Sequence, residues 1–310
     1  MRVALLATAD FAIPALKALI SSSHQVVGVI TGPDQPSGRG QKVQATPVKS
    51  AAKSLHLPIL TPERFKDPTF LAEYASWRPD LAVVAAFRIL PPQVFDLPPL
   101  GTLNIHPSLL PELRGPAPIP WALIQGKTET GVSIIRITNR VDAGGVLLQR
   151  RVTIDPDETA GQLASHLAEI GAELLLETIE RLNWGTLLPI PQNENAVTKA
   201  PKLAKDDGRI DWSQDALTVH NRVRGVTPNP GAFTFLDNSL IKLSHSRLSD
   251  GGGNPGEILS ITDSRLVVAC SKGAVEFSEI QRSGKRRLTI EEFFRGYHLT
   301  GQSRFTSHLL

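Results

Sequence analysis

The sequence contains only one cysteine, Cys270, in 310 residues, so no disulfide can form within the chain. Because Cys270 ends the strand-like run 266–270, we expect it to be a small buried hydrophobic residue in a reducing compartment. The sequence also lacks a cysteine cluster and the HExxH pattern, so it offers no zinc site. We therefore predict a protein without disulfides and without a metal.

Long hydrophobic runs are missing as well. No apolar stretch approaches the roughly 18 residues that are needed to span a bilayer. Residues 1–7 carry one positive charge and a short apolar run, which is typical of a first strand and not of a signal peptide. We expect a soluble, cytoplasmic protein without a membrane partner, and the sequence indicates no obligate protein partner.

Two nucleotide-binding fingerprints are also absent. Gly38 and Gly40 could begin a GxGxxG pattern, but Val43 stands where the third glycine is needed. No GxxxxGK[ST] loop occurs either. A dinucleotide or nucleoside triphosphate cofactor is therefore not predicted.

What the first part of the chain does contain is a regular alternation of two patterns. Short runs of aliphatic and β-branched residues predict strands that are covered on both faces, and helical spacing between them predicts helices. This alternation is typical of an α/β fold with a Rossmann-like, open, mostly parallel sheet and flanking helices. The expected strands are 2–7, 25–31, 81–85, 102–106 and 132–137, and the expected helices are 11–20, 47–54, 69–76 and 117–125.

The chain is long enough for two hydrophobic cores. A long helix is expected from about 158 to about 182, and three prolines then follow among polar residues, a composition that favours an extended linker. Beyond it, one helix near 216–224 and several short alternating runs predict a small β-barrel. We therefore expect an N-terminal domain at 1–188, a linker at 189–206 and a C-terminal OB-like barrel at 207–310.

Charge is unevenly distributed between these parts. Residues 1–200 hold 18 basic and 18 acidic side chains, whereas residues 201–310 hold 15 and 12, so the net charge of +3 lies in the last third. Such a small surplus is weak support for a polyanionic partner on its own.

Asn104 and His106 stand two residues apart near the end of an expected central strand. Side chains alternate along a strand, so both project from one face. They also lie at the carboxyl edge of the sheet, where open α/β sheets bind ligands. Taken alone, a histidine at this place is more often an ordinary, partly buried residue.

The surrounding sequence changes that interpretation, because four groups of residues follow one another in a characteristic order. They are Asn104-x-His106-x-Ser108-Leu109-Leu110-Pro111, Arg114-Gly115-x-Ala117-Pro118-Ile119, Gly131-Val132-Ser133 and Asp142-Ala143-Gly144. Together they closely resemble the folate-dependent formyltransferase family. Further stretches resemble the branch of that family that formylates methionyl initiator tRNA, so the resemblance runs nearly end to end. These stretches are 31–40, 47–49, 201–212, 224–232, 281–286 and 294–296.

The resemblance implies an activity and a reacting centre. The formyl group of 10-formyltetrahydrofolate would pass to the amino group of methionyl initiator tRNA, releasing tetrahydrofolate. Asn104 and a protonated His106 would donate to the formyl oxygen as it gains negative charge. Asp142 would favour the charged form of His106 and accept the proton that the amine loses. From its sequence position alone, Asp142 could equally be an aspartate that caps a turn.

The resemblance also implies a folate pocket, made by the segment after His106 and by the end of the strand 81–85. Core packing remains an alternative for the two leucines of the first segment. The chain departs from many family members at Phe87-Arg88 and at Gly145, both of which flank this pocket. The expected folate-binding residues are Ser108, Leu109, Leu110, Pro111, Phe87, Arg88, Ile89 and Leu90.

Two basic stretches are expected to contact tRNA. One is the Gly- and Pro-rich loop with Arg39 and Lys42, where a flexible surface loop is the plainer interpretation. The other is a cluster near the end of the barrel, which could also be a solvated face but would suit a nucleic-acid backbone. This cluster consists of Arg282, Lys285, Arg286, Arg287 and Arg295.

Two other functions remain open. A relative of the same family that formylates an amino sugar on a nucleotide would also fit the segment 135–144. A noncatalytic RNA-binding protein on the same scaffold is the second alternative. The basic stretches argue against the first, and the complete set of Asn104, His106 and Asp142 argues against the second.

Overall fold

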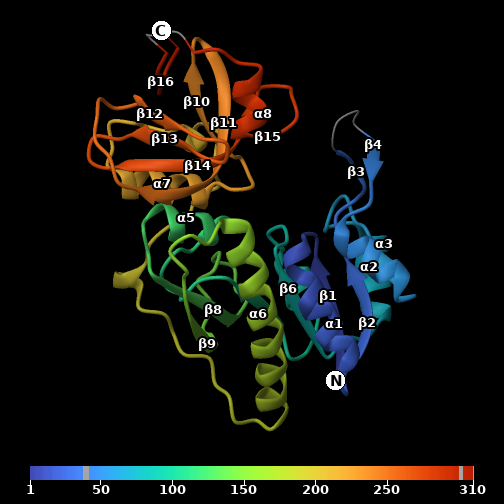
Figure 1. Ribbon diagram of the computed structural model, residues 1–310. Helices are drawn as coiled ribbons and strands as arrows, with labels where there is room; N and C mark the ends of the chain where they lie inside the picture. Colours follow the sequence, from blue (N-terminus) through green and yellow to red (C-terminus); the bar gives the residue numbers. More distant parts are fainter. Residues whose placement is uncertain (38–41, 300–302, 310) are drawn as a thin grey trace. The chain divides into compact units, whose positions relative to one another are not determined.

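The computed structural model describes residues 1–37, 42–299 and 303–309, and the chain divides into two compact units (Figure 1). Unit 1 consists of Met1–Pro118, Glu129–Thr153 and Ala164–Ala200. Unit 2 consists of Ile119–Thr128, Ile154–Leu163 and Pro201–Leu310. No helix in the described part of the chain is long and apolar enough to cross a membrane.

Unit 1 is built on a seven-stranded sheet with the order β5-β2-β1-β6-β7-β8-β9. The strands from β5 to β7 pair in parallel, whereas β8 is antiparallel to β7 and β9 is antiparallel to β8. The expected open, mostly parallel sheet is therefore confirmed, with one antiparallel edge. The strands are β1 Arg2–Ala7, β2 Gln25–Ile30, β5 Ile59–Leu60, β6 Leu81–Ala85, β7 Thr102–His106, β8 Glu129–Arg136 and β9 Val146–Thr153.

Helices flank this sheet, as Figure 1 shows in blue and green. Two of them begin at capping residues: the side chain of Thr46 accepts from the amide of Lys49, and that of Asp67 accepts from the amide of Thr69. The sequence pattern missed a short hairpin, β3 Gln35–Ser37 with β4 Lys42–Gln44, and the edge strand β9. The helices are α1 Ile13–Ser21, α2 Pro47–Ser54, α3 Pro68–Ser76, α4 Pro92–Phe95 and most of α6 Ala160–Asn183.

The central strand β7 is held tightly from both sides. It pairs with β6 and β8, and Leu103 and Ile105 are buried in the core. Gly171 lets α6 approach closely, because a Cβ there would lie only 2.9 Å from Cγ2 of Ile105. A strand fixed in this way holds its polar residues in one position.

Unit 2 is a curled antiparallel sheet with the order β12-β13-β14-β11-β10-β16, and β15 pairs with β14. Its ends meet, since Phe305 donates its backbone N–H to the carbonyl of Gly256 at 2.8 Å. Gly256 has a φ of +86° and no room for a Cβ beside the backbone of Phe305. The expected small barrel is confirmed. Its elements are α7 Ala216–Gly225, β10 Ala232–Leu236, β11 Ser239–Ser249, β12 Ile258–Ile261, β13 Leu266–Ala269, β14 Ala274–Arg282, β15 Leu288–Thr289, α8 Ile290–Arg295 and β16 Phe305–Thr306.

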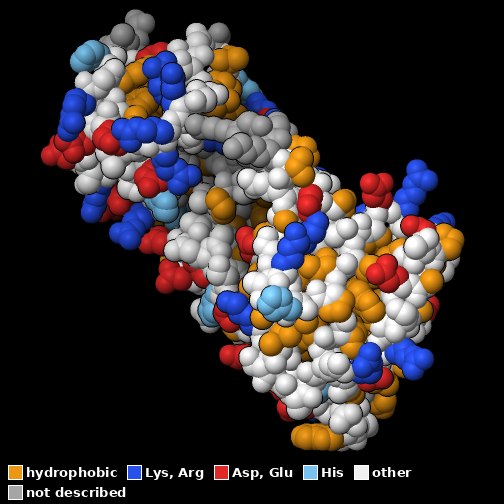
Figure 2. Space-filling model, turned by 90° about the vertical axis from the view of Figure 1, so that its right-hand side faces the viewer, with side chains coloured by type: hydrophobic (Ala, Val, Ile, Leu, Met, Phe, Trp, Pro, Cys, Tyr) orange, Lys and Arg blue, Asp and Glu red, His pale blue; other side chains and the backbone are white. Residues whose placement is uncertain are grey.

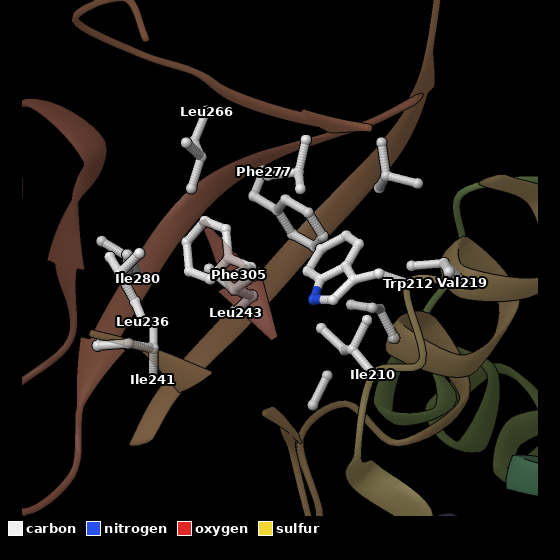
Figure 3. Packing of buried hydrophobic residues seen from close by; sticks show 14 of the residues in the cluster. Ile210, Trp212, Val219, Leu236, Ile241, Leu243, Leu266, Phe277, Ile280 and Phe305 are labelled. Carbon is white, nitrogen blue, oxygen red and sulfur yellow. The ribbon is translucent and has the colours of Figure 1, made fainter. Parts of the chain in front are cut away.

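The barrel core packs around Trp212, whose ring lies beside Phe277 and Phe305 (Figure 3). The indole N–H is not left unsatisfied, because it donates to Oγ1 of Thr234 at 2.9 Å. Helix α7 adds Val219 and Val223 to the same cluster.

Two earlier chain segments also belong to unit 2. Helix α5, Pro118–Ile124, packs against α7, and Gly225 makes room for Ile124 there. His220 on α7 hydrogen-bonds the carbonyl of Pro156 through Nε2 at 2.9 Å. The domain boundaries expected from the sequence, with a single linker, assigned both of these segments to the N-terminal domain.

Candidate active site

The carboxyl-terminal half of β7 presents Asn104 and His106 on one face. Asn104 is partly buried, and the whole of His106 is only 4% exposed. Nε2 of His106 lies 3.0 Å from the carbonyl oxygen of Leu113. Because a carbonyl oxygen can only accept, Nε2 carries a proton. Nδ1 is therefore the nitrogen that gains or loses a proton.

A third polar residue meets this face from the loop between β8 and β9. Oδ1 of Asp142 lies 3.6 Å from Nδ1 of His106 and 3.5 Å from Nδ2 of Asn104. Its other oxygen, Oδ2, accepts from the backbone N–H of Gly115 at 2.9 Å. The amide, the imidazole and the carboxylate expected from the sequence thus lie together, with Oδ1 facing both nitrogens.

Burial opposes the charged state of His106 that the resemblance implied. Burial lowers the pKa of His106 from its ordinary value, and the nearby Asp142 carboxylate and the Leu113 carbonyl only partly oppose this effect. Asp142 thus opposes the effect of burial without outweighing it, and the protonated His106 expected from the sequence stays a prediction. The imidazole is neutral near pH 7, with a lone pair on Nδ1.

Asp142 adopts a left-handed backbone conformation with φ +51°, so its loop needs support. On one side, Gly144 fits against the carbonyl oxygen of Arg136, where a Cβ would collide. On the other side, Nε2 of Gln192 donates to the carbonyl oxygens of Asp142 at 2.8 Å and Gly144 at 2.7 Å. The loop is held between a strand and a side chain.

Gln192 belongs to an extended segment that is bound along unit 1. Ile190 exchanges two backbone hydrogen bonds with Val146, and Arg114 exchanges backbone hydrogen bonds with Thr198 and Ala200. The sequence interpretation assigned no role to Gln192 or to Arg114. A glutamine among prolines and polar residues carries no signal of such a role in a single sequence.

The residues after His106 are mostly turned inward. The hydroxyl of Ser108 donates to the carbonyl of Glu112 at 2.6 Å, and Leu110 is buried. Leu109 covers Gly131 of β8, and Pro111 follows a cis peptide bond. Leu109 and Leu110 thus pack against the sheet, the alternative that the sequence left open for them.

The second expected folate segment lies at the end of β6. Ile89 is 78% exposed and Leu90 is buried, whereas Phe87 packs on Phe65 with ring centroids 5.9 Å apart. Arg88 lies over the ring of Phe65, at 4.4 Å from the centroid, and donates to the carbonyl of Pro62 at 2.7 Å. Within the described part of the chain, residues 87–89 make no backbone hydrogen bond.

The structure describes all of the expected tRNA-binding residues except Arg39. Arg39 lies outside the described residues, and Lys42 is the first residue of β4. In unit 2, Arg286 pairs with Glu292 and Arg287 with Glu279, each at 3.0 Å, and Arg295 pairs with Glu291. Arg282 lies over the ring of Tyr297, and the backbone N–H of Lys285 donates to the carbonyl of Arg282.

The basic cluster of unit 2 is thus accompanied by three glutamates. Glu291 and Glu292 lie within the same stretch of sequence, whereas Glu279 comes from the neighbouring part of β14. Figure 2 shows Lys and Arg side chains next to Asp and Glu side chains on the face that it draws.

Two family models match this chain. "Formyl transferase" matches residues 1–179, and "Formyl transferase, C-terminal domain" matches residues 202–298. A methionyl-tRNA formyltransferase from Citrifermentans bemidjiense is 43% identical over 300 residues, which are 96% of this chain and 94% of that protein.

Solved structures share the fold at lower identity. HypX from Aquifex aeolicus, in complex with tetrahydrofolic acid, is 22% identical with a TM-score of 0.66 over 95% of this chain. The match spans 47% of HypX, so this chain is about half as long. An N-formyltransferase from Helicobacter canadensis, in complex with folinic acid and dTDP-3-aminofucose, is 16% identical with a TM-score of 0.67 over 91% of this chain and 99% of that one.

Proposed function

The chain belongs to the methionyl-tRNA formyltransferase family, and from that premise we propose that it transfers the formyl group of 10-formyltetrahydrofolate to the amino group of methionyl initiator tRNA. The product would be N-formylmethionyl-tRNA for translation initiation in the cytoplasm. We further propose that Asn104, His106 and Asp142 form its reacting centre.

One observation carries this assignment. The amide nitrogen of Asn104 and Nδ1 of His106 both face Oδ1 of Asp142 at 3.5–3.6 Å, so both nitrogens already point at one oxygen, and Nδ1 becomes a donor once it is protonated. When an amine attacks a formyl carbon, the carbonyl oxygen becomes an anion that needs such donors. A formyl oxygen seated beside Oδ1 would be reached by both nitrogens.

The neutral state of His106 fits this chemistry. The α-amino group at the start of a chain, whose carboxyl group is bound in an amide, titrates at about 7.7–8.0, so such an amine is partly protonated near neutral pH and has to lose a proton before attack. The lone pair of Nδ1, with Asp142 beside it, would accept that proton. The imidazolium formed in this way would donate to the oxygen anion. Burial disfavours the charged imidazole until the anion develops, so its stabilising effect is concentrated in the transition state.

The atoms of the reaction balance without a metal or an oxidant. The bond from the amino nitrogen to the formyl carbon forms, and the bond from that carbon to N10 of the folate breaks. The ammonium nitrogen loses two protons in all: one ends on N10 as tetrahydrofolate leaves, and the other is released to solvent. We propose that His106 and Asp142 carry the first of these protons between the two nitrogens.

The residues at the end of β6 suit a folate co-substrate. The backbone groups of residues 87–89 have no backbone partner among the described residues, so they are free to pair with the polar edge of a pteridine ring. The exposed side chain of Ile89 would supply apolar contact to a ring face. We therefore retain 87–90 and 108–111 as the proposed folate-binding residues.

For the tRNA we propose Arg39 and Lys42 near the acceptor end, and the cluster of Arg282, Lys285, Arg286 and Arg287 on the phosphate backbone. Exposed arginines and lysines bind phosphates without reading the base sequence. The clustering of these basic residues supports this proposal, although three glutamates reduce its net charge.

The test is a transfer assay with purified protein and 10-formyltetrahydrofolate labelled in the formyl group. One reaction contains initiator tRNA charged with methionine, and the other contains a nucleotide-linked amino sugar. We expect label only in the acid-precipitable tRNA. Label confined to the sugar would overturn the proposed acceptor, and label in neither would overturn the proposed activity.

A further inference from the structure

Gln192 makes four hydrogen bonds that join the chain segments around the reacting centre. Its Nε2 donates to the carbonyl oxygens of Asp142 and Gly144, at 2.8 and 2.7 Å. Its Oε1 accepts from Nε of Arg114 at 3.0 Å and from Nη2 at 2.8 Å. A guanidinium can only donate and a carbonyl can only accept, so the orientation of this amide follows from its partners.

These bonds complete a ring of contacts around Asp142. Gln192 holds the backbone of Asp142 and is itself held by Arg114. The residue after Arg114, Gly115, donates its backbone N–H to Oδ2 of Asp142 at 2.9 Å. The backbone and the carboxylate of Asp142 are therefore fixed by two neighbouring points of one segment.

The ring is anchored at several further places. Gly115 has a φ of +128° and lies directly against the carbonyl of Ala200, so a side chain there would collide. Arg114 also pairs with Glu194, with 2.9 Å between Nη2 and Oε1, and Arg140 pairs with the same carboxylate at 2.7 Å. These two arginines lower the pKa of Glu194 to about 2, so it stays charged throughout the neutral range.

From this geometry we infer that Gln192 is a positioning residue for the transfer reaction, which holds the carboxylate of Asp142 against His106 and Asn104. It touches neither the imidazole nor the reacting atoms in this role. The tie fixes a left-handed backbone conformation at Asp142, which aspartate adopts more readily than most residues but which persists only when surrounding contacts hold it. Without the two donated bonds, the loop is free to rotate its carboxylate away from β7.

This inference rests on the proposed function, and it predicts that loss of Gln192 lowers kcat. Ground-state contacts with either substrate would be preserved when Asp142 moves, so KM for the folate and for the tRNA should change little. Displacing a reacting group by about 1 Å can cost about a hundredfold in rate. We expect a fall in kcat of between about tenfold and a hundredfold.

The sharpest variant is Gln192→Glu, because it keeps the size of the side chain. A carboxylate still accepts from Arg114, but it cannot donate to the carbonyls of Asp142 and Gly144. Gln192→Leu removes both sets of bonds without adding a charge. The two variants share only the loss of the donor. Asn195→Asp is the matched control, since it adds the same charge to the same segment and the Asn195 side chain makes no hydrogen bond within the described part of the chain.

The second readout is the titration of the His106 imidazole, followed by NMR in the protein without substrates. Asp142 raises the pKa of His106 against the effect of burial. The ionisable group that acts on the imidazole is Asp142, and the other facing polar group is the Leu113 carbonyl. Releasing Asp142 should therefore move the His106 midpoint to lower pH in both Gln192 variants, and not in Asn195→Asp.

The outcomes separate the two proposals. A lower kcat together with a lower His106 midpoint in both Gln192 variants supports the positioning role. An unchanged kcat, or a lower kcat with the His106 midpoint of the unaltered protein, overturns it. If the unaltered protein transfers no formyl group to tRNA, the proposed function fails, but the NMR titration still decides whether Gln192 controls the Asp142–His106 contact.

Discussion

The proposed reacting centre of unit 1 and the basic cluster of unit 2 use charge in opposite ways. Around β7 a few polar groups are buried, and each is held by a partner: His106 by Leu113, and Asp142 by Gly115. At the end of the barrel the charges are numerous and exposed, and most arginines pair with a glutamate. Burial strengthens each electrostatic contact in the first region, whereas water and salt screen the ion pairs in the second.

This difference shows why the two regions should respond differently to substitution. A buried donor that is aimed at a developing anion acts with little screening, so its loss is felt in full. An exposed ion pair contributes about 0–1 kcal/mol, because the side chains lose entropy and the solvent screens them. The following predictions test this contrast, starting with the largest expected effect.

Removing either proposed donor should have the largest effect. We expect His106→Ala and Asn104→Ala each to lower kcat about a hundredfold or more, since one oxyanion donor is worth about 2.7–4 kcal/mol. Binding of methionyl initiator tRNA, measured by filter binding at fixed salt, should be nearly unchanged. Normal turnover in both variants would remove the basis for a reacting centre on β7.

The next prediction concerns the protonation of His106. Burial favours the neutral imidazole, so the folded-state pKa of His106 lies below its ordinary value, and the charged form appears only as the pH falls through that lower value. Asp142→Asn removes the charge that opposes burial, so the midpoint should fall further. The measurement is an NMR titration of the eight histidine side chains, with the His106 signal identified by its absence in His106→Ala. A midpoint that rises in Asp142→Asn contradicts this account.

How much of this could be predicted from the sequence depends on the kind of contact. The strand of Asn104 and His106 follows from a local apolar pattern, and side-chain alternation alone places both residues on one face. The approach of Asp142 required the family resemblance, because Asp142 lies 36 positions after His106 in the sequence and no local rule reports such contacts. Nothing in the sequence indicated the roles of Gln192 and of the Leu113 carbonyl, because these roles depend on the folded backbone.

The protonation of His106 is equally hard to predict from the sequence. The family resemblance implied a neighbouring carboxylate, but the degree of burial has no sequence signal, and burial has the larger effect on the pKa here. The basic cluster shows the same limitation. Arg282 to Arg295 can be counted along the chain, whereas the pairing of Arg287 with Glu279 depends on the antiparallel ladder of β14 and β15.

Removing charge from the cluster should have a moderate effect. We expect Arg286→Ala and Arg287→Ala to weaken tRNA binding a few-fold each, with kcat unchanged at saturating tRNA. Each arginine that releases counterions from a phosphate contributes about 0.7–0.9 to the slope of log affinity against log salt. Binding measured over a salt series should therefore show a reduced slope. An unchanged slope in both variants would exclude this face as a phosphate contact.

The smallest expected effect has the opposite sign. Glu279 pairs with Arg287 at 3.0 Å and lies 3.5 Å from Nε2 of His245. Glu279→Gln would keep a hydrogen-bond acceptor for Arg287 but remove the charge that competes with a phosphate. Because an exposed pair is worth at most about 1 kcal/mol, tRNA affinity should rise no more than about fivefold. Glu276→Gln is the matched control on the same strand, since Glu276 pairs with Arg265, outside the cluster. A gain at low salt that disappears at high salt in Glu279→Gln, without a gain in Glu276→Gln, would show that exposed acids limit the charge this surface presents to tRNA.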